Sequence, residues 1–233
     1  MTARLIACHS ILRLDARHPV AARCLLDAQD MHRLVMSGFR GWVEDGQRDA
    51  RAQLGVLSTW SVDLRGNTLL VVVQSKVGPD WSHLPGEALT AKVETLGVDQ
   101  PLRTGDRFGF RAVLAPLTAR RDLKNPERGT RKLPQARPEH VRDWLLKRSQ
   151  PTGDEPAAPN GVRRIGAAFD PESLAIRMLP AVTSRHHAGL KITRSEIRGQ
   201  LTVTDPDAFH ATLADGLGSG RAYSCGLLLV RSP

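Results

Sequence analysis

One order of strand and helix patterns occurs twice along this chain of 233 residues. The first copy begins with a strand pattern at Arg4–Leu14 and a helical pattern from Pro19, a residue favoured at the first position of a helix. The rest of this copy comprises strands at 53–62, 69–73 and 91–96, with a weak helical pattern at 79–84 before the last strand. This β-α-β-β-α-β order is that of a ferredoxin-like domain.

The second copy follows a boundary at 100–105. Phe108 and Phe110 alternate with Arg107 and Arg111, which predicts a strand with one basic face. Next come patterns for a helix at 138–148, a mobile loop at 150–161, strands at 164–169, 174–179 and 197–204, a helix capped by Asp205, and a strand at 226–230. The predicted fold class is therefore α+β, with two tandem ferredoxin-like (RRM-like, βαββαβ) domains at 1–101 and 102–233.

The first helical pattern is expected to run from Pro19 to about Glu44. Its apolar face consists of Cys24, Ala28, Met31, Val35, Phe39 and Trp42. At about 100° per residue, His32 falls roughly 60° from the centre of this face. A histidine at such a border can have its ring held by packing and its edge exposed to a ligand. The same spacing also suits a half-buried histidine with only a structural role.

The charge balance indicates a polyanionic partner. The chain has 33 Lys and Arg against 24 Asp and Glu, a formal net charge of +9. Of the 33 cations, 27 are arginine, which binds phosphate through paired donors better than lysine does. A GC-rich genome would explain the preference for arginine over lysine, but it would not explain the excess of basic over acidic residues.

The sequence contains neither an apolar run long enough to span a membrane nor the order of regions that marks a signal peptide. Cys8, Cys24 and Cys225 are isolated from one another, so they match no zinc spacing and no disulfide framework. We therefore expect a cytoplasmic protein with reduced thiols, no bound metal, no cofactor and no membrane partner.

Two basic segments are candidate RNA contacts. The connector between Leu117 and Arg137 is either a solvated loop or a flexible strip of cations for a phosphate backbone. Its core cations are Arg120, Arg121, Lys124, Arg128, Arg131 and Lys132. The second segment, 184–198, contains Arg185, His186, His187 and Lys191 and is predicted to be a basic hairpin that meets RNA. Adjacent histidines share no helix or strand face, so a paired metal site is not expected there.

A glycine-rich stretch at 215–226 follows a helix and precedes a strand. A dinucleotide-binding loop has the reverse order, so that interpretation fails. Gly218 and Gly220 permit positive φ and close backbone approach, and Arg221 adds a cation, so the stretch can bind an anion. The alternative is a helix cap followed by a turn, although three alternating glycines exceed what a cap needs.

These motifs together resemble the CasE-type CRISPR RNA endonuclease family, the repeat-processing subunit of type I-E systems. The resemblance covers nearly the whole chain. It is carried by Met31-His32 on the first helix, the strand at 110–112 with its basic connector and Trp144-Leu145, the stretch 198–206 ending in Asp-Pro, and the glycine-rich loop with its final strand at 216–230. Two departures stand out: Gln29 replaces a common tyrosine, and Ser224 replaces a common glycine.

The resemblance implies a metal-independent endoribonuclease that binds the stem-loop repeat of precursor CRISPR RNA. It would cleave at the 3′ base of the stem by 2′-OH attack and keep the product within the surveillance complex of a prokaryotic cell. His32 is then the candidate acid or base, and Arg33, Arg185 and Lys191 are candidate cations. Tyr223, the only tyrosine, could compensate for Gln29.

Two alternatives remain open. The missing tyrosine also suits a catalytically impaired RNA-binding subunit of the same complex. A general RNA-binding protein of tandem ferredoxin-like modules is disfavoured, because the strand with Phe108 and Phe110 lacks the Gly-flanked basic pattern of an RNP motif.

Overall fold

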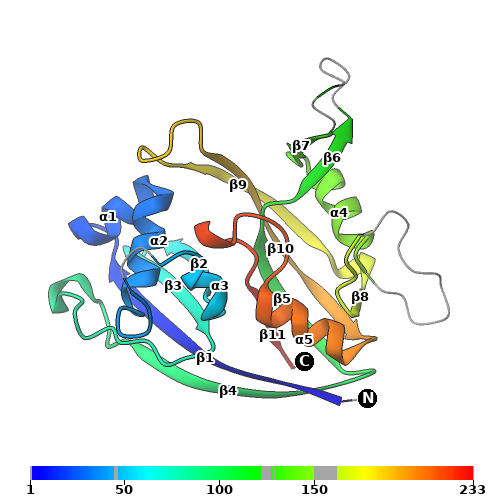
Figure 1. Cartoon of the computed structure of the whole chain (residues 1–233), viewed down its shortest axis with the longest axis horizontal. Helices are drawn as coiled ribbons and strands as arrows, with labels where there is room; N and C mark the ends of the chain where they lie inside the picture. Colours follow the sequence, from blue (N-terminus) through cyan, green and yellow to red (C-terminus); the bar gives the residue numbers. More distant parts are fainter. Residues whose placement is uncertain (1, 45–46, 122–126, 128–129, 150–161, 233) are drawn as a thin grey trace.

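A computed structural model describes residues 2–44, 47–121, 127, 130–149 and 162–232 of the chain (Figure 1). The expected loop at 150–161 lies outside these ranges. In the described parts, no helix combines the length and the apolar character that crossing a membrane requires.

The first half forms a four-stranded antiparallel sheet with the order β2-β3-β1-β4. Its strands are β1 (Thr2–Asp15), β2 (Leu57–Asp63), β3 (Thr68–Ser75) and β4 (Glu94–Arg103). The helices α1 (Pro19–Leu26), α2 (Ala28–Ser37) and α3 (Ala50–Gln53) connect β1 to β2. This strand order is that of the ferredoxin-like fold.

The second half repeats this order as β11-β5-β10-β8, with β9 also paired to β10. Its strands are β5 (Arg107–Leu114), β8 (Ala167–Phe169), β9 (Ala175–Thr183), β10 (Lys191–Val203) and β11 (Leu228–Arg231). Its helices are α4 (Pro138–Leu146), α5 (Pro206–Asp215) and the 3₁₀ turns η4 (Pro171–Ser173) and η5 (Arg221–Tyr223). The predicted α+β fold class is confirmed, and the domain division at residues 101 and 102 stays a proposal.

The expectation of one continuous helix from Pro19 to Glu44 is wrong. Asp27 has φ −139° and ψ 123°, so it ends α1, and its carboxylate accepts a hydrogen bond of 2.8 Å from the Gln29 N–H to cap α2. The helix ends at Ser37, and Gly38 lies against the indole of Trp81, where a Cβ would come within 2.6 Å of the ring. Trp42 therefore leaves the apolar face and is 56% exposed.

The weak helix expected at 79–84 is also wrong. Pro85 disfavours helical geometry at the residue before it, and only the short 3₁₀ helix η1 (Gly86–Ala88) forms between β3 and β4. The connection nevertheless covers the core, because Trp81 is buried and packs edge-on against Phe39 with ring centroids 6.1 Å apart.

The two halves share one of the apolar cores. Leu5, Ala7 and Leu102 of the first sheet belong to the same buried cluster as Phe209 and Leu213 of α5. The Gln74 side-chain amide also donates a hydrogen bond of 2.8 Å to the Leu213 carbonyl. A second cluster lies beneath α1 and α2. The shared core holds the second half against the sheet of the first, which fixes where their loops meet.

The sequence predicts a loop or a flexible strip for the basic connector, whereas its described residues include two paired strands. Part of it forms an antiparallel hairpin from β6 (Leu117–Arg121) and β7 (Thr130–Pro134), and the Trp144 indole N–H of α4 donates to the Leu117 carbonyl at 3.0 Å. Lys124 and Arg128 lie outside the described residues, as do the side chains of Arg120 and Arg121.

Candidate active site and nucleic-acid interface

His32 lies half-buried on α2, facing the glycine-rich loop that follows α5. Its ring centroid is 6.3 Å from that of Tyr223, at an angle of 60° between the planes. A hollow of about 730 Å³ opens beside it, and its lining includes Gln29, Arg40, Arg51 and Ala222. The chain thus brings its only tyrosine next to the candidate histidine, although the two are far apart in sequence.

The surroundings of His32 favour its neutral form. Burial lowers the pKa of His32 below its ordinary 6.5, and although an interaction with the Ala222 backbone raises it, the charges of Arg51 and Arg33 lower it further. The imidazole is therefore neutral at pH 7 and can accept a proton. This balance of charge and burial suits a general base.

The glycine-rich loop is held in a strained shape by contacts with both halves. Gly216, Gly218 and Gly220 all have positive φ, between 71° and 84°. Ser224 also adopts a positive φ of 58°, and its buried hydroxyl shares a hydrogen bond of 2.9 Å with Ser58 of β2. That bond gives a physical reason why serine is accepted at a position where the resembled family commonly has glycine.

Arg221 stabilises this loop from within. Its Nε donates to the Gly218 carbonyl at 3.2 Å, and its Nη1 donates to the Asp215 carbonyl at 2.9 Å. The guanidinium of Arg221 is thereby fixed in place. Burial lowers the pKa of Arg51, and the nearby charge of Arg221 lowers that pKa further.

A larger hollow of about 1200 Å³ continues from the loop toward α4 and the β6–β7 hairpin. We call it the basic trough. Among its described lining residues the cations are Arg51, Lys132, Lys147, Arg148 and Arg221, and the acid is Asp143. Arg51 and Ala222 line both the trough and the His32 hollow, so His32 lies where the trough ends.

Arg51 is a site residue that the sequence patterns did not indicate. It lies on α3, just before a segment expected to be a strand, and no motif marks it. Its Nη1 donates to the Val56 carbonyl at 2.9 Å, which fixes the side chain at the junction of the two hollows. Only the fold brings this cation near His32. Arg131, in contrast, lies on β7 and does not line the trough.

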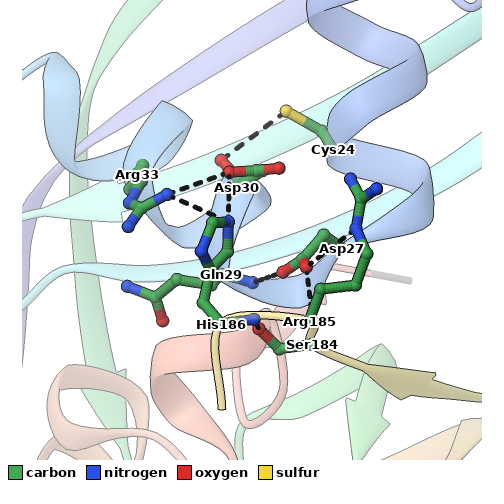
Figure 2. Close-up of polar contacts among 8 residues, drawn as sticks. All are labelled: Cys24, Asp27, Gln29, Asp30, Arg33, Ser184, Arg185 and His186. Carbon is green, nitrogen blue, oxygen red and sulfur yellow. Dashed lines mark hydrogen bonds and ion pairs between the residues drawn. The ribbon is translucent and has the colours of Figure 1, made fainter.

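Two of the other candidate cations, Arg33 and Arg185, belong to a separate cluster at the break between α1 and α2 (Figure 2). The tip of the β9–β10 hairpin reaches this break, where the Arg185 N–H donates to the Asp27 carboxylate at 2.7 Å. Arg33 forms an ion pair of 3.2 Å with Asp30 and contacts the His186 ring at 3.2 Å. We call these five residues the hairpin latch.

Arg33 lines the His32 hollow, whereas neither Arg185 nor Lys191 does. Lys191 begins β10 and is exposed. The hairpin therefore joins the two halves of the protein, and it does not bring all of its cations to the histidine.

Asp27, Asp30 and His186 also present possible metal-ligand atoms within 4.8 Å of one another. Burial of Asp27 would raise its pKa, but hydrogen bonds from the backbone of Arg185 and Gln29 bring the pKa down to about 2. The Asp27 carboxylate is thus ionised, and Arg185 lies 3.8 Å from it, while Arg33 forms an ion pair with Asp30. The arrangement fits an ion-paired contact between the halves.

Asp27→Ala should destabilise the protein more than the loss of an ordinary helix cap does. Loss of a cap typically costs about 1 kcal/mol, and this substitution also removes the acceptor for Arg185. Asp205→Ala is the matched control, because Asp205 caps α5 through the Asp207 and Ala208 N–H groups. Urea denaturation should show the larger loss of unfolding free energy for Asp27→Ala. Equal losses would mean that the latch contributes nothing to stability.

Comparison with known proteins identifies relatives along nearly the whole chain. The model of a family described as CRISPR associated protein matches residues 9–232. A solved CRISPR endoribonuclease Cse3 bound to a 19-nucleotide RNA is 24% identical with a TM-score of 0.73, over 97% of this chain and 98% of that chain. No curated protein matches.

Two further solved structures are similar. Cse3 of Thermus thermophilus, bound to an RNA representing a pre-cleavage complex, is 22% identical with a TM-score of 0.69, over 97% of this chain and 99% of that chain. A chain of a CRISPR RNA-guided surveillance complex is 20% identical with a TM-score of 0.60, over 97% and 100%. At these identities the solved structures establish the shared fold.

Proposed function

Because this chain belongs to the CRISPR-associated protein family, we propose that it is a metal-independent endoribonuclease acting on precursor CRISPR RNA. It binds the stem-loop repeat and cleaves at the 3′ base of the stem. It then retains the mature RNA within a surveillance complex, like the complex that contains one of its structural relatives. We assign this activity to the cytoplasm of a prokaryotic cell.

The observation that carries the proposal is the position of a neutral, half-buried His32 at the end of the basic trough. A phosphate backbone lying along the trough would meet Arg51, Lys132 and Lys147 before it reached the imidazole. Proton-transfer chemistry and phosphate binding thus come together at one place, as cleavage within an RNA strand requires.

In the proposed reaction, His32 accepts the proton of the 2′-OH next to the scissile phosphate. The 2′ oxygen attacks phosphorus in line, the bond to the 5′ oxygen breaks, and the products carry a 2′,3′-cyclic phosphate and a 5′-OH. A proton must reach the departing oxygen, and the Tyr223 hydroxyl or a water molecule can supply it. Arg51 stabilises the additional negative charge of the transition state.

The direct test is a cleavage gel with one repeat RNA in excess EDTA. We expect cleavage to continue at an unchanged rate, because the proposed proton transfers involve side chains and water and no metal ion. An excess of random-sequence RNA should not suppress it, since recognition depends on the shape and phosphates of the stem. Loss of activity in EDTA with recovery in magnesium would refute the mechanism, and equal competition by random RNA would favour a general RNA-binding protein.

Arg51→Ala should slow cleavage by about 10- to 100-fold, because one cation near the developing charge is lost. Binding of the repeat should weaken only a few-fold, since the trough has other cations. Arg51→Lys should recover part of the rate by restoring the charge. Single-turnover kinetics and filter binding, with circular dichroism to verify folding, separate these effects. A variant that cleaves at the wild-type rate would exclude Arg51 from the site.

A catalytically impaired RNA-binding subunit is the second candidate function. Gln29, which replaces the tyrosine common in the resembled family, lines the His32 hollow and cannot act as an acid or base. Tight repeat binding without any cleavage by the wild-type protein would support this function over the first.

A further inference from the structure

The sheet of the second half carries a second strongly basic surface, on the side opposite the buried core. The strand registers place five arginines on this outward side of the sheet. They are Arg107 and Arg111 of β5, Arg177 of β9, Arg198 of β10 and Arg231 of β11. The alternate residues Phe108 and Phe110 are buried beneath them. We call this surface the arginine face.

Its charge is nearly unopposed. At the outward positions that the structure describes on these strands, Glu196 is the only acid. A hollow of about 900 Å³ runs over the face, and its described lining contains Arg107, Arg111, Arg198 and Arg231 without any acid. None of these four residues lines the basic trough or the His32 hollow.

Glu196 holds three of the arginines in fixed positions. It is 4% exposed, its Oε1 accepts hydrogen bonds from Arg111 at 2.6 Å and Arg198 at 3.0 Å, and its Oε2 accepts one from Arg177 at 2.7 Å. Although burial opposes ionisation, hydrogen bonds from Arg198 and Arg111 lower the pKa of Glu196 to about 2. One buried carboxylate thus orients three guanidiniums, and the side chains of Arg177 and Arg198 remain 70% and 60% exposed.

This arrangement favours a phosphate backbone as the partner. Fixed guanidiniums lose little freedom when they bind phosphate, and they present paired donors to its oxygens. No aromatic side chain occupies the outward positions that the structure describes on these strands, so the strands themselves offer no platform for stacking bases. Binding there should follow the charge of a strand and ignore its sequence.

We propose that the arginine face binds the single-stranded RNA that flanks the repeat hairpin, as a site separate from the basic trough. The inference relies on the proposed function for the identity of the RNA. It adds a second, sequence-independent contact, which would help to retain an RNA after it has been cut. Glu196 is its positioning residue.

The experiment compares three RNAs that carry a 2′-deoxy substitution at the scissile position: the bare hairpin, and the hairpin with a single-stranded extension of about ten nucleotides on its 5′ or its 3′ side. Filter binding is measured for the wild type and for Arg198→Gln/Arg231→Gln. The control, Arg17→Gln/Arg65→Gln, removes the same charge from exposed positions outside the hollows described here.

We expect at least one extension to tighten wild-type binding about tenfold, equally for oligo-U and oligo-A. The arginine-face variant should lose most of this gain, with a salt slope smaller by about 1.4. It should bind the bare deoxy hairpin normally and should cut the all-ribose form of that hairpin normally. The control should keep the gain. The proposal would be overturned if neither extension tightened binding by the wild type. It would also be overturned if the arginine-face substitutions weakened binding of the bare and the extended hairpins by the same factor. Either result would favour an acidic protein surface as the partner of the face.

Binding of the extension is also measured with the extension as a separate oligonucleotide. The arginine face is then tested even if the protein does not bind the hairpin. Failure to bind the hairpin would contradict the proposed function alone. Glu196→Gln then distinguishes orientation from charge. It makes the face more positive, so charge alone predicts tighter binding of the extension. The orienting role predicts weaker binding, and tighter binding by the folded variant would refute that role.

Discussion

His32→Ala should reduce the single-turnover cleavage rate by about 10²- to 10⁴-fold, the usual effect of losing one proton-transfer group. Repeat binding should stay within a few-fold of wild type, because the cations of the basic trough remain in place. His83→Ala is the control. The His83 ring contacts Ser37 of α2, the helix that carries His32, at 2.8 Å. Because His83 does not line the His32 hollow, this variant reports only on disturbance of α2.

The pH dependence tests the role of His32 more closely. A base must be neutral, and the pKa of His32 in the unbound protein lies below 6.5 because of burial. With limiting enzyme and substrate, the wild-type rate should therefore be on its plateau at pH 7 and fall as the pH drops below 6.5. His32→Ala should lack this decline. A rate that falls as pH rises through this range would assign His32 as the acid.

A folded His32→Ala variant with a near wild-type rate would leave His32 a structural histidine. The search would then move to Arg185 and Lys191, which the structure places away from the His32 hollow. Equal loss of activity in His83→Ala would instead show that α2 itself had been disturbed.

Replacing the ribose on the 5′ side of the scissile phosphate by deoxyribose should abolish cleavage altogether. The attacking 2′-OH is then absent, so no acid, base or cation of the protein can compensate. Binding should change by less than about threefold, because one hydroxyl contributes little beside many phosphate contacts. Filter binding and a cleavage gel on the same RNA measure the two effects.

The matched RNA carries the deoxyribose one nucleotide further upstream and should be cut normally. Cleavage of the first substrate at any measurable rate would require a water nucleophile. That result would contradict the proposed reaction even if His32 proved essential.

Local patterns were sufficient for much of the fold. The alternation of Phe108 and Phe110 with arginines predicted β5 and its basic face, and Asp205 caps α5 as expected. Both signals depend on neighbours within a few residues, where backbone geometry alone determines which side chains share a face. The border position of His32 is of the same kind, since helical spacing predicted its half-burial.

Local patterns failed where the deciding partner is distant in the chain. The break at Asp27 interrupts a continuous helical spacing, and its carboxylate binds the backbone of Arg185, 158 positions away, as well as capping α2. The strained Ser224 is paired with Ser58, which is 166 positions away. No periodicity indicates such a pairing.

The sequence by itself therefore determined the α+β class, the order of most of the strands and the face of the helix on which His32 lies. The tertiary structure alone decided what surrounds that histidine. Tyr223 approaches it because a shared core packs α5 against the first sheet and so places the glycine-rich loop against α2, whereas Arg51 reaches it from α3 within the first half. The electrostatics that keep His32 neutral come from burial and charges brought together by long-range packing, which no short stretch of sequence encodes.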